Sequence, residues 1–420
     1  MGIIGDNILF NNGVVTAYYI LPLANYNAIS DKGKLSSIIS VTNLINNLVS
    51  QRPELQFSLQ RISKIIKKED VYNNLIETIQ MYQPDYTMPD EFSSRIQNNN
   101  TEYCLLGIDI QQSDTFDLEG QSIKDTMKQV ITQGAEKLLS VTSNNLDFEK
   151  ILSIEKNIFS VIRTGCVRAS RDLVFYNYVS KLYPAYAISY TKQSFFKEDN
   201  VTNILGSLTQ TVEDNFGYFI MHNEGIDIFD AIPQDIYGCI LNIRSFPPII
   251  LSYNFPLNMY EGNIQVNVKT IKKEEAEITL KRRRASDRFE IEQAVEAGGE
   301  NEQVQKIVES INIAERALSD IDEGMPVCRF NASILVLGST KEELDTNVNM
   351  VQSGLKDRDI IAAKSLNQAT DFINTYVKLI PASYDHMSSL QFPLSFQLNS
   401  GSTVGEFDSP YSIPAIGVDL

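Results

Sequence analysis

The chain has 420 residues, of which 43% are apolar and 21% are charged. This composition is typical of a folded protein with room for two or three domains, and it argues against intrinsic disorder. The formal net charge of −17 at pH 7 argues against non-specific binding of nucleic acid, because contacts with phosphates need clustered lysine and arginine.

The first 145 residues predict an N-terminal α+β domain. Residues 6–10 and 14–21 flank an Asn-Gly pair and predict a β-hairpin, because both turn residues of such a hairpin need positive φ. Residues 55–62 alternate polar and apolar side chains and predict a half-buried strand. The expected arrangement is a mainly antiparallel sheet with helices on one face. The other predicted elements are helices over 35–49, 71–79 and 123–139 and a strand over 101–110.

Residues 146–390 predict a second α+β domain with an antiparallel sheet covered by helices. Within it, residues 272–321 predict a charged, antiparallel helical pair, two helices around a Gly-Gly turn, which projects from or packs across the sheet. The other predicted elements are helices over 146–161 and 173–182, and strands over 217–221, 226–229, 236–243 and 263–271.

A strand, a turn and a helix over residues 329–356 form the clearest local unit. The apolar run 330–337 predicts a buried strand that ends at Gly338. A capping box then starts a helix, with either Ser339 and Glu342 or Thr340 and Glu343 at the required spacing. No Gly-Lys-Ser or Gly-Lys-Thr occurs anywhere, so this turn is not a nucleotide-binding P-loop. The helix is expected to bury one side, made of Leu344, Val348, Val351 and Leu355.

Cysteine and histidine are too scattered to predict a metal site. No two cysteines form a C-x-x-C pair, and only two histidines occur. We expect buried, reduced thiols in a cytoplasmic protein, and no catalytic residue, metal or cofactor in this chain. No apolar run approaches the roughly 20 residues needed to span a bilayer. The residues concerned are Cys104, Cys166, Cys239, Cys328, His222 and His386.

The order of the motifs resembles the N-terminal part of the conjugation ATPases of type IV secretion systems, the VirB- and TraC-like family. The resemblance begins with DNILF at 6–10, leading to Tyr18 and Tyr19, and includes the strand before KEEL at 341–344. It continues through DIIAA at 359–363, QATDF at 368–372, LIP at 379–381, GSTVGEF at 401–407 and residues 411–419.

The resemblance implies a non-catalytic region that attaches a hexameric motor to inner-membrane channel subunits at the cytoplasmic face of the cell membrane and aids oligomerisation. Residues 391–420 would then lead toward a P-loop motor domain that this chain lacks, and the chain is expected to be a fragment. ATP and Mg are implied for that motor domain only. A second hypothesis is a stand-alone structural or scaffold protein of a mobile element or phage. An enzyme is disfavoured, because no set of catalytic residues is recognised.

The main candidate contact site is the basic cluster Lys281, Arg282, Arg283, Arg284 and Arg288, which would meet anionic lipid or an acidic partner. The alternative is a solvated helix face whose cations pair with nearby acids; those acids are Glu274, Glu275, Glu277 and Glu290.

Two weaker candidates also have plain structural interpretations. Basic and aromatic residues between 163 and 183 would stack on single-stranded nucleic acid or form an ordinary helix start with core-facing tyrosines. The segment 246–251 would dock on a membrane subunit or pack inside. The residues of the first group are Arg163, Arg168, Arg171, Tyr176, Tyr178 and Tyr183.

Overall fold

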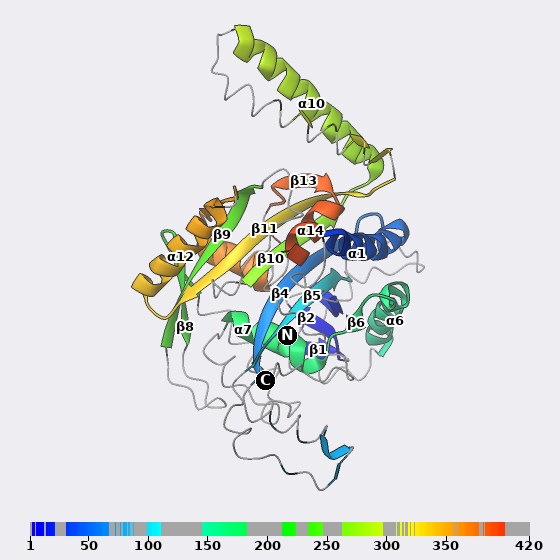
Figure 1. The fold of residues 1–420 in the computed structure, drawn as a ribbon, viewed down its shortest axis with the longest axis vertical. Coiled ribbons are helices and arrows are strands. Elements are labelled where there is room, and N and C mark those ends of the chain that lie inside the picture. Colours follow the sequence, from blue (N-terminus) through cyan, green and yellow to red (C-terminus); the bar gives the residue numbers. More distant parts are fainter. Residues whose placement is uncertain are drawn as a thin grey trace.

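The computed structural model contains one continuous antiparallel sheet (Figure 1). It describes residues 2–21, 31–66, 99–110, 145–182, 212–223, 234–246, 263–296 and 324–399, except 5, 12–13, 358, 378–380 and 382, together with isolated positions in 72–87 and 308–322. The strands are β1 (Gly2–Ile4), β2 (Ile8–Asn11), β3 (Val14–Leu21), β4 (Gln56–Ile66), β5 (Asn99–Asp109), β6 (Val167–Arg168), β7 (Val212–Asn215), β8 (Tyr218–Asn223), β9 (Gln234–Ser245), β10 (Asn263–Thr270), β11 (Val327–Gly338), β12 (Ile361–Lys364) and β13 (His386–Ser389).

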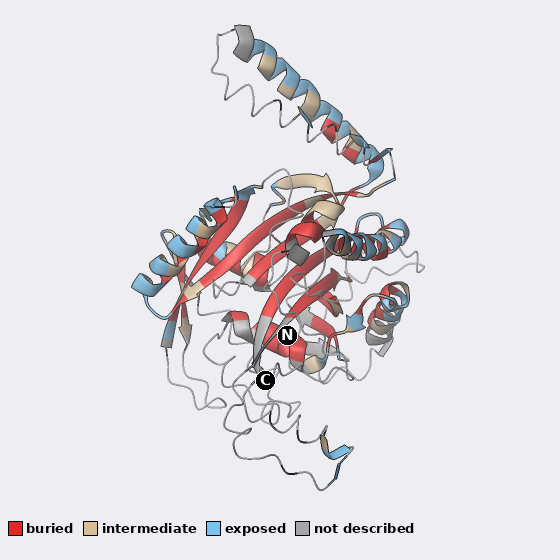
Figure 2. Ribbon diagram, viewed as in Figure 1, coloured by how far each residue is buried: buried red, intermediate tan, exposed pale blue. Residues whose placement is uncertain are grey.

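The expected α+β class is confirmed, but helices cover both faces of the sheet. One core lies between the sheet and α1, α6, α12 and α14. A second core, on the opposite face, contains residues of α7, α13 and η5. The expectation of helices on one face was therefore wrong, and buried residues fill both layers (Figure 2). The helices are α1 (Asp31–Gln51), α6 (Asn145–Ile162), α7 (Arg171–Leu182), α10 (Lys273–Glu296), α12 (Lys341–Lys356), α13 (Gln368–Phe372), the π-helical turn η5 (Ile373–Val377) and α14 (Gln391–Asn399).

The two predicted halves share the same sheet. The strand order is β1-β2-β3-β5-β4-β10-β11-β9-β8-β7. β4 from the first half pairs with β10 from the second, with Gln60 opposite Gln265 and Phe57 opposite Val268. Main-chain hydrogen bonds therefore join residues on the two sides of the domain boundary predicted at residue 145. The boundary stays a prediction.

The N-terminal hairpin is confirmed by the pairing of β2 with β3. Asn11 lies opposite Val14, which leaves the two residues of the predicted Asn-Gly turn between the strands. A two-residue connection of this kind matches the twist of the paired strands. The Asn-Gly signal therefore predicted the pairing of β2 with β3.

The unit formed by β11 and α12 also follows the prediction. Thr340 is the N-cap, and its hydroxyl accepts the N–H of Glu343, whose carboxylate accepts the N–H of Ser339 at 2.8 Å. The second of the two proposed capping boxes is therefore the correct one. Gly338 is required before the cap, because a Cβ at this position would lie 2.6 Å from the backbone nitrogen of Leu344. All four residues of the predicted apolar stripe are buried.

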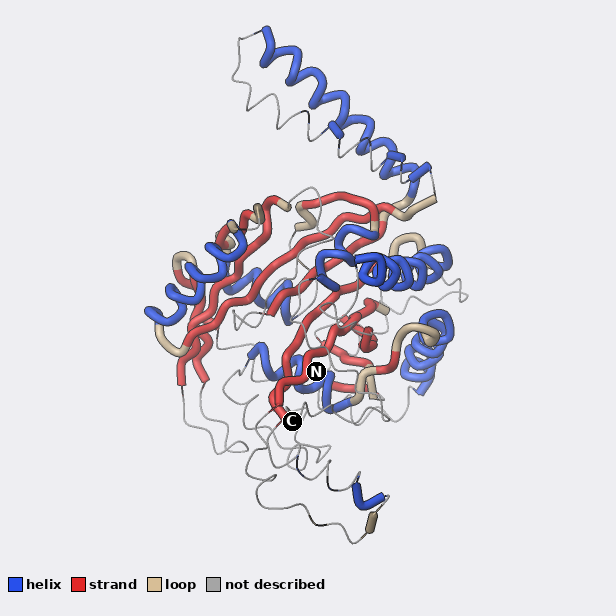
Figure 3. Tube along the Cα trace, in the orientation of Figure 1, coloured by secondary structure: helices blue, strands red, loops and turns tan. Residues whose placement is uncertain are grey.

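α10, the first helix of the predicted charged pair, projects from the sheet body (Figure 3). α10 begins three residues after β10 ends, and the described positions from 308 to 322 are helical and precede β11. A small core at the base joins Ala276 and Leu280 of α10 to Leu318 and Ile321 of the second helix. β10 and β11 pair along eight residues, so both ends of the pair begin on adjacent central strands.

Several predictions fall on positions that the structure does not describe. The helix over 123–139, the strand over 226–229 and the segments 379–380 and 401–419 lie outside the described residues. Within the predicted helix 71–79, the described positions Tyr72, Ile76 and Ile79 are helical.

Candidate functional site

The predicted basic cluster lies in the middle of α10, on the projecting pair. Lys281 pairs with Glu277 one turn earlier, with 2.8 Å between Nζ and Oε2. Arg288 lies 3.2 Å from a carboxylate oxygen of Glu315 on the second helix, and Arg284 lies 3.9 Å from the same oxygen. The pairing that the solvated-face alternative expected is thus present for Lys281. The two arginines use an acid that sequence reasoning missed, because it lies 27 residues beyond Arg288.

These pairs leave much of the positive charge of the cluster open to a partner. Arg282 is exposed, and no ion pair to it occurs within the described ranges. The side chain of Arg283 lies outside the described residues. Exposed ion pairs contribute only about 0.2–1 kcal/mol each, so a binding partner can exchange them at little cost.

The described tyrosines of the weaker basic group face the core, as its structural interpretation expected. Tyr176 and Tyr178 are buried beneath the sheet. Arg168 makes two hydrogen bonds of 2.8 Å with Glu155, one to each carboxylate oxygen, and its guanidinium lies 3.9 Å from the ring centre of Phe159. Arg163 is exposed and Tyr183 lies outside the described residues, so these positions do not form an aromatic surface for nucleic acid.

Glu155 is the centre of a buried network that sequence reasoning missed. Its side chain also accepts hydrogen bonds from the Asn7 amide and from the Tyr19 hydroxyl, each at 3.2 Å. Burial and the Glu155 carboxylate raise the pKa of Tyr19 far above its usual value, which keeps the hydroxyl protonated as a donor. The network therefore joins α6 to the N-terminal hairpin and to β6.

The apolar segment that begins at Phe246 packs inside at its one described residue. The Phe246 ring lies 5.6 Å from the Phe330 ring and 5.1 Å from the Phe396 ring, measured between centroids. Interior packing is therefore confirmed for Phe246, while 247–251 lie outside the described residues.

All four cysteines are free and buried, as expected. Burial raises the pKa of Cys104 and of Cys239 to about 11, so both thiols stay protonated at neutral pH. His222 contacts Asp235 and Glu213, at 3.0 Å and 3.1 Å, on the exposed side of β7, β8 and β9, and these carboxylates raise its pKa. Within the described ranges no group of histidine, cysteine and acidic residues is arranged to hold a metal ion.

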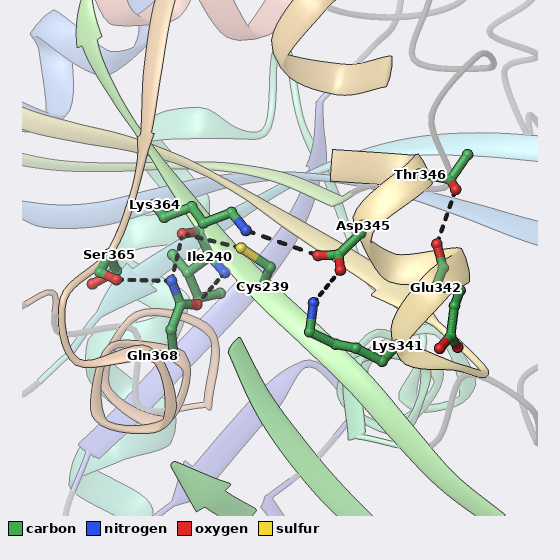
Figure 4. Close-up of polar contacts among 9 residues, drawn as sticks. All are labelled: Cys239, Ile240, Lys341, Glu342, Asp345, Thr346, Lys364, Ser365 and Gln368. Carbon is green, nitrogen blue, oxygen red and sulfur yellow. Dashed lines mark hydrogen bonds and ion pairs between the residues drawn. The ribbon is translucent and has the colours of Figure 1, made fainter. Parts of the chain in front are cut away.

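Gln368 fills a gap in the sheet with its side chain (Figure 4). β8 pairs with β9 as far as Gly238, and β12 pairs with the same edge of β9 from Leu241 onward. Between them, the Gln368 side chain accepts the N–H of Ile240 at 2.6 Å and donates to its carbonyl oxygen at 3.2 Å. The carboxamide thus replaces the missing strand residue and fixes the start of α13 against β9.

The Gln368→Ala variant is expected to lose about 1–3 kcal/mol of stability, because it leaves the N–H of Ile240 without its acceptor in the protein interior. Amide hydrogen exchange at Ile240 should accelerate by the corresponding factor. The matched control is Gln352→Ala, since Gln352 also donates to a strand carbonyl, that of Ala362, but from a partly exposed position. Equal losses of stability in the two variants would contradict this role of Gln368.

At the start of α12 lies a small charged group, also drawn in Figure 4. Asp345 accepts from Lys341 and lies 4.0 Å from the Nζ of Lys364 on β12. The ammonium of Lys341 lies 4.8 Å from the ring centre of Tyr218. This arrangement joins α12 to β8 and β12, and we assign it a structural role.

A buried polar layer lies on the sheet face covered by α7 and η5. It runs across β4, β10 and β11, where Gln60, Gln265 and Ser333 are opposite one another in register. These positions alternate with apolar residues, and for β4 this alternation predicted that the polar side would face solvent. The prediction is wrong, because α7 covers that side of β4. The members of the polar layer, all buried, are Gln56, Ser58, Gln60, Gln265, Asn267, Asn331 and Ser333.

Lys181 of α7 points its ammonium into the polar layer. Its Nζ donates to Oε1 of Gln60 at 2.5 Å, and the Asn177 amide donates to the same oxygen at 2.8 Å. No carboxylate contacts Lys181 among the described residues. Burial without a counter-charge lowers the pKa of Lys181 to about 7. The layer therefore contains one amine that titrates near neutral pH.

No family model matches the chain, and no match is found among curated proteins. No helix within the described part of the chain is both long and apolar enough to cross a membrane.

Proposed function

We propose that this chain is the N-terminal, non-catalytic region of a type IV secretion or conjugative transfer ATPase, which attaches the motor to the inner-membrane channel and aids oligomerisation. The observation that carries the proposal is the projecting helical pair, whose middle segment exposes Lys281, Arg282 and Arg288 away from the sheet body (Figure 2). A projecting arm with exposed positive charge is suited to docking on another protein.

The way in which the arm is rooted supports a role in transmitting movement. Both of its helices connect to β10 and β11, which pair with each other along eight residues. These strands are buried on both faces and hydrogen-bonded further to β4 and β9. A displacement of the arm would therefore reach the centre of a rigid sheet, because packed interiors transmit strain.

The charge distribution supports attachment through the arm at the cytoplasmic face of the membrane. With a net charge of −17, the chain as a whole is repelled by anionic lipid, so the contact is expected with a channel subunit and not with the bilayer itself. A basic cluster on a projecting element brings positive charge to an acidic subunit while the rest of the chain stays at a distance. In this proposal the inner-membrane channel subunits are the partners and a hexamer is the working assembly.

The proposal is tested by fractionating cells that express the chain with and without the subunits of a conjugative secretion channel. We expect the chain in the inner-membrane fraction only when the channel subunits are present. An identical distribution in both strains would overturn the proposal. A regular assembly that forms in cells without any channel subunit would favour a scaffold protein of a mobile element or phage.

A further inference from the structure

α10 has an inner side that packs within the helical pair. Its members recur at three- and four-residue intervals along one side of the helix and are all buried or half-buried. Leu280 is 2% exposed, and Arg284 lies near Glu315 of the second helix. The inner residues are Ala276, Leu280, Arg284, Asp287 and Ile291.

The opposite side of α10 carries an exposed stripe, which we call the outer stripe and define as Ile278, Arg282, Ala285 and Phe289. Intervals of four, three and four residues place these positions on one line, as in the seam of a coiled coil. Ile278 is 52% exposed and Phe289 is 59% exposed, although both are large and apolar. All four residues are exposed, so the described positions of the second helix do not cover the stripe.

We propose that the outer stripe binds an amphipathic helix of a partner protein, with apolar residues of that helix against Ile278 and Phe289 and a carboxylate against Arg282. This inference rests on the proposed function and names the kind of channel segment that the arm would contact. Knobs-into-holes packing would bury the two apolar side chains, and the carboxylate would neutralise the guanidinium that comes to lie in the seam.

An acidic partner is favoured by the cations beside the stripe. Lys281 and Arg288 lie seven residues apart on the same flank, where charged residues set the choice of partner in coiled coils. The acids that now accompany them, Glu277 and Glu315, are themselves partly or largely exposed. A partner helix with carboxylates along this flank would therefore gain ion pairs with both cations.

Pairing of the outer stripe with a second copy of this chain is electrostatically poor. An antiparallel pairing that places Ile278 opposite Phe289 also places Glu275 opposite Glu292 of the other copy, because each facing pair keeps the same sum of residue numbers. A parallel pairing would place two copies of Arg282 together. Like charges in such positions oppose association, so the stripe fits a different protein.

A lipid surface is also a poor fit. α10 carries seven acidic residues against six basic ones, and acidic residues lie on both sides of the basic cluster along the helix. Helices that lie in membrane interfaces are rich in lysine and arginine on their polar face, which attracts anionic lipid. The acidic ends of α10 would be repelled from that surface.

The test places a photo-crosslinking residue at Phe289 of the full chain, in cells that contain the secretion channel, with Glu290 on the side of the helix as the control position. We expect crosslinking from position 289 to a helical segment of a channel subunit that carries carboxylates. Crosslinks from position 289 to lipid only, or to a second copy of this chain, would overturn the inference.

The second part of the test measures affinity by calorimetry with a peptide that spans the crosslinked segment. Arg282→Glu should weaken binding of the peptide at least tenfold, which corresponds to about 1.4 kcal/mol. Replacing the facing carboxylate of the peptide by lysine should restore the affinity for this variant. The control Lys156→Glu, an exposed lysine on α6, should bind as the parent does.

Recruitment of the chain by the channel and binding of the peptide by the outer stripe can be tested separately. If the channel recruits the parent chain but Arg282→Glu binds the peptide as well as the parent does, this inference fails while the proposed function stands. If the channel does not recruit the chain at all, the proposed function and the inference fail together.

Discussion

The Lys181→Met variant should be more stable than the parent chain at pH 7 by about 3 kcal/mol. Burial lowers the pKa of Lys181 from 10.5 to about 7, and each unit of pKa corresponds to about 1.4 kcal/mol of unfavourable burial of the charged form. Methionine has a similar length and no charge. The loss of the hydrogen bond from Lys181 to Gln60 offsets only part of this gain in stability, because Gln60 still accepts a hydrogen bond from Asn177.

The stability difference should depend on pH in a defined direction. Between pH 7 and about 10, the unfolded chain binds a proton at Lys181 that the folded chain does not, so the parent gains stability at about 1.4 kcal/mol per pH unit from this group. Below the pKa of Lys181 in the folded chain, this amine is protonated in both the folded and the unfolded chain. It then no longer contributes to the change of stability with pH. The advantage of the Lys181→Met variant should therefore reach its maximum at and below about pH 7 and be nearly absent at pH 9.

Urea unfolding of both proteins at pH 7, 8 and 9 measures this difference, because other titrating groups cancel between parent and variant. Lys156→Met removes an exposed lysine on α6 and should leave both the stability and its pH dependence nearly unchanged. A variant less stable than the parent at every pH would show that Lys181 has a stabilising counter-charge.

The Glu155→Ala variant should lose about 2–5 kcal/mol, because it leaves two buried donors without their acceptor, at about 1–3 kcal/mol each, and breaks an ion pair whose Arg168 side chain is 39% exposed. The variant removes the acceptor of Asn7 and Tyr19, which are both buried, and the two hydrogen bonds from Arg168. Denaturant unfolding measures the loss. Hydrogen exchange should locate its effect in α6 and the N-terminal hairpin.

Glu315→Ala provides the matched control for this prediction. Glu315 also lies close to two arginines, but its side chain is 45% exposed, whereas that of Glu155 is 4% exposed. We expect the Glu315 variant to lose less than about 1 kcal/mol. A comparable small loss in the Glu155 variant would mean that the buried network contributes little to the stability of the fold.

The sequence predicted the elements whose signals are local. The hairpin between β2 and β3 depends on the Asn-Gly turn, and the helix after β11 depends on Thr340 and Glu343. These signals act through turn geometry and capping, which neighbouring residues determine. The continuous sheet could not be predicted in this way, because the pairing of β4 with β10 joins residues about 200 positions apart.

The polar layer shows why alternation alone does not reveal which face is exposed. Gln60 and Gln265 alternate with apolar residues, as solvent-facing residues do in a sheet with one covered side. Both are buried, because α7 and η5 pack over them. Nothing local to β4 or β10 indicates this cover, and the helix that provides it carries Lys181, a residue that is rarely buried.

The candidate contact site was predicted in part. The basic cluster is visible as a run of four cations from Lys281 to Arg284, and α10 presents the described members of the cluster on the projecting arm. The outer stripe was missed, because Ile278 and Phe289 are separated by charged residues and become a common surface only once the inner side of α10 is known.

The most direct test of the central claim, that the arm attaches this chain to a membrane channel, is charge reversal of its basic cluster. The measurement is the amount of chain that copurifies with the inner-membrane channel after Lys281, Arg282 and Arg288, the exposed members of the cluster, are each replaced by glutamate. A control with the same change in net charge replaces three exposed cations of the body by glutamate, namely Lys32, Lys156 and Lys356.

We expect the arm variant to lose at least nine-tenths of its copurification, which corresponds to about 1.4 kcal/mol or more of binding free energy, with an unchanged Tm. The body variant should copurify as the parent does. Undiminished copurification of the arm variant, or an equal loss in the two variants, would contradict the claim that this cluster makes the attachment.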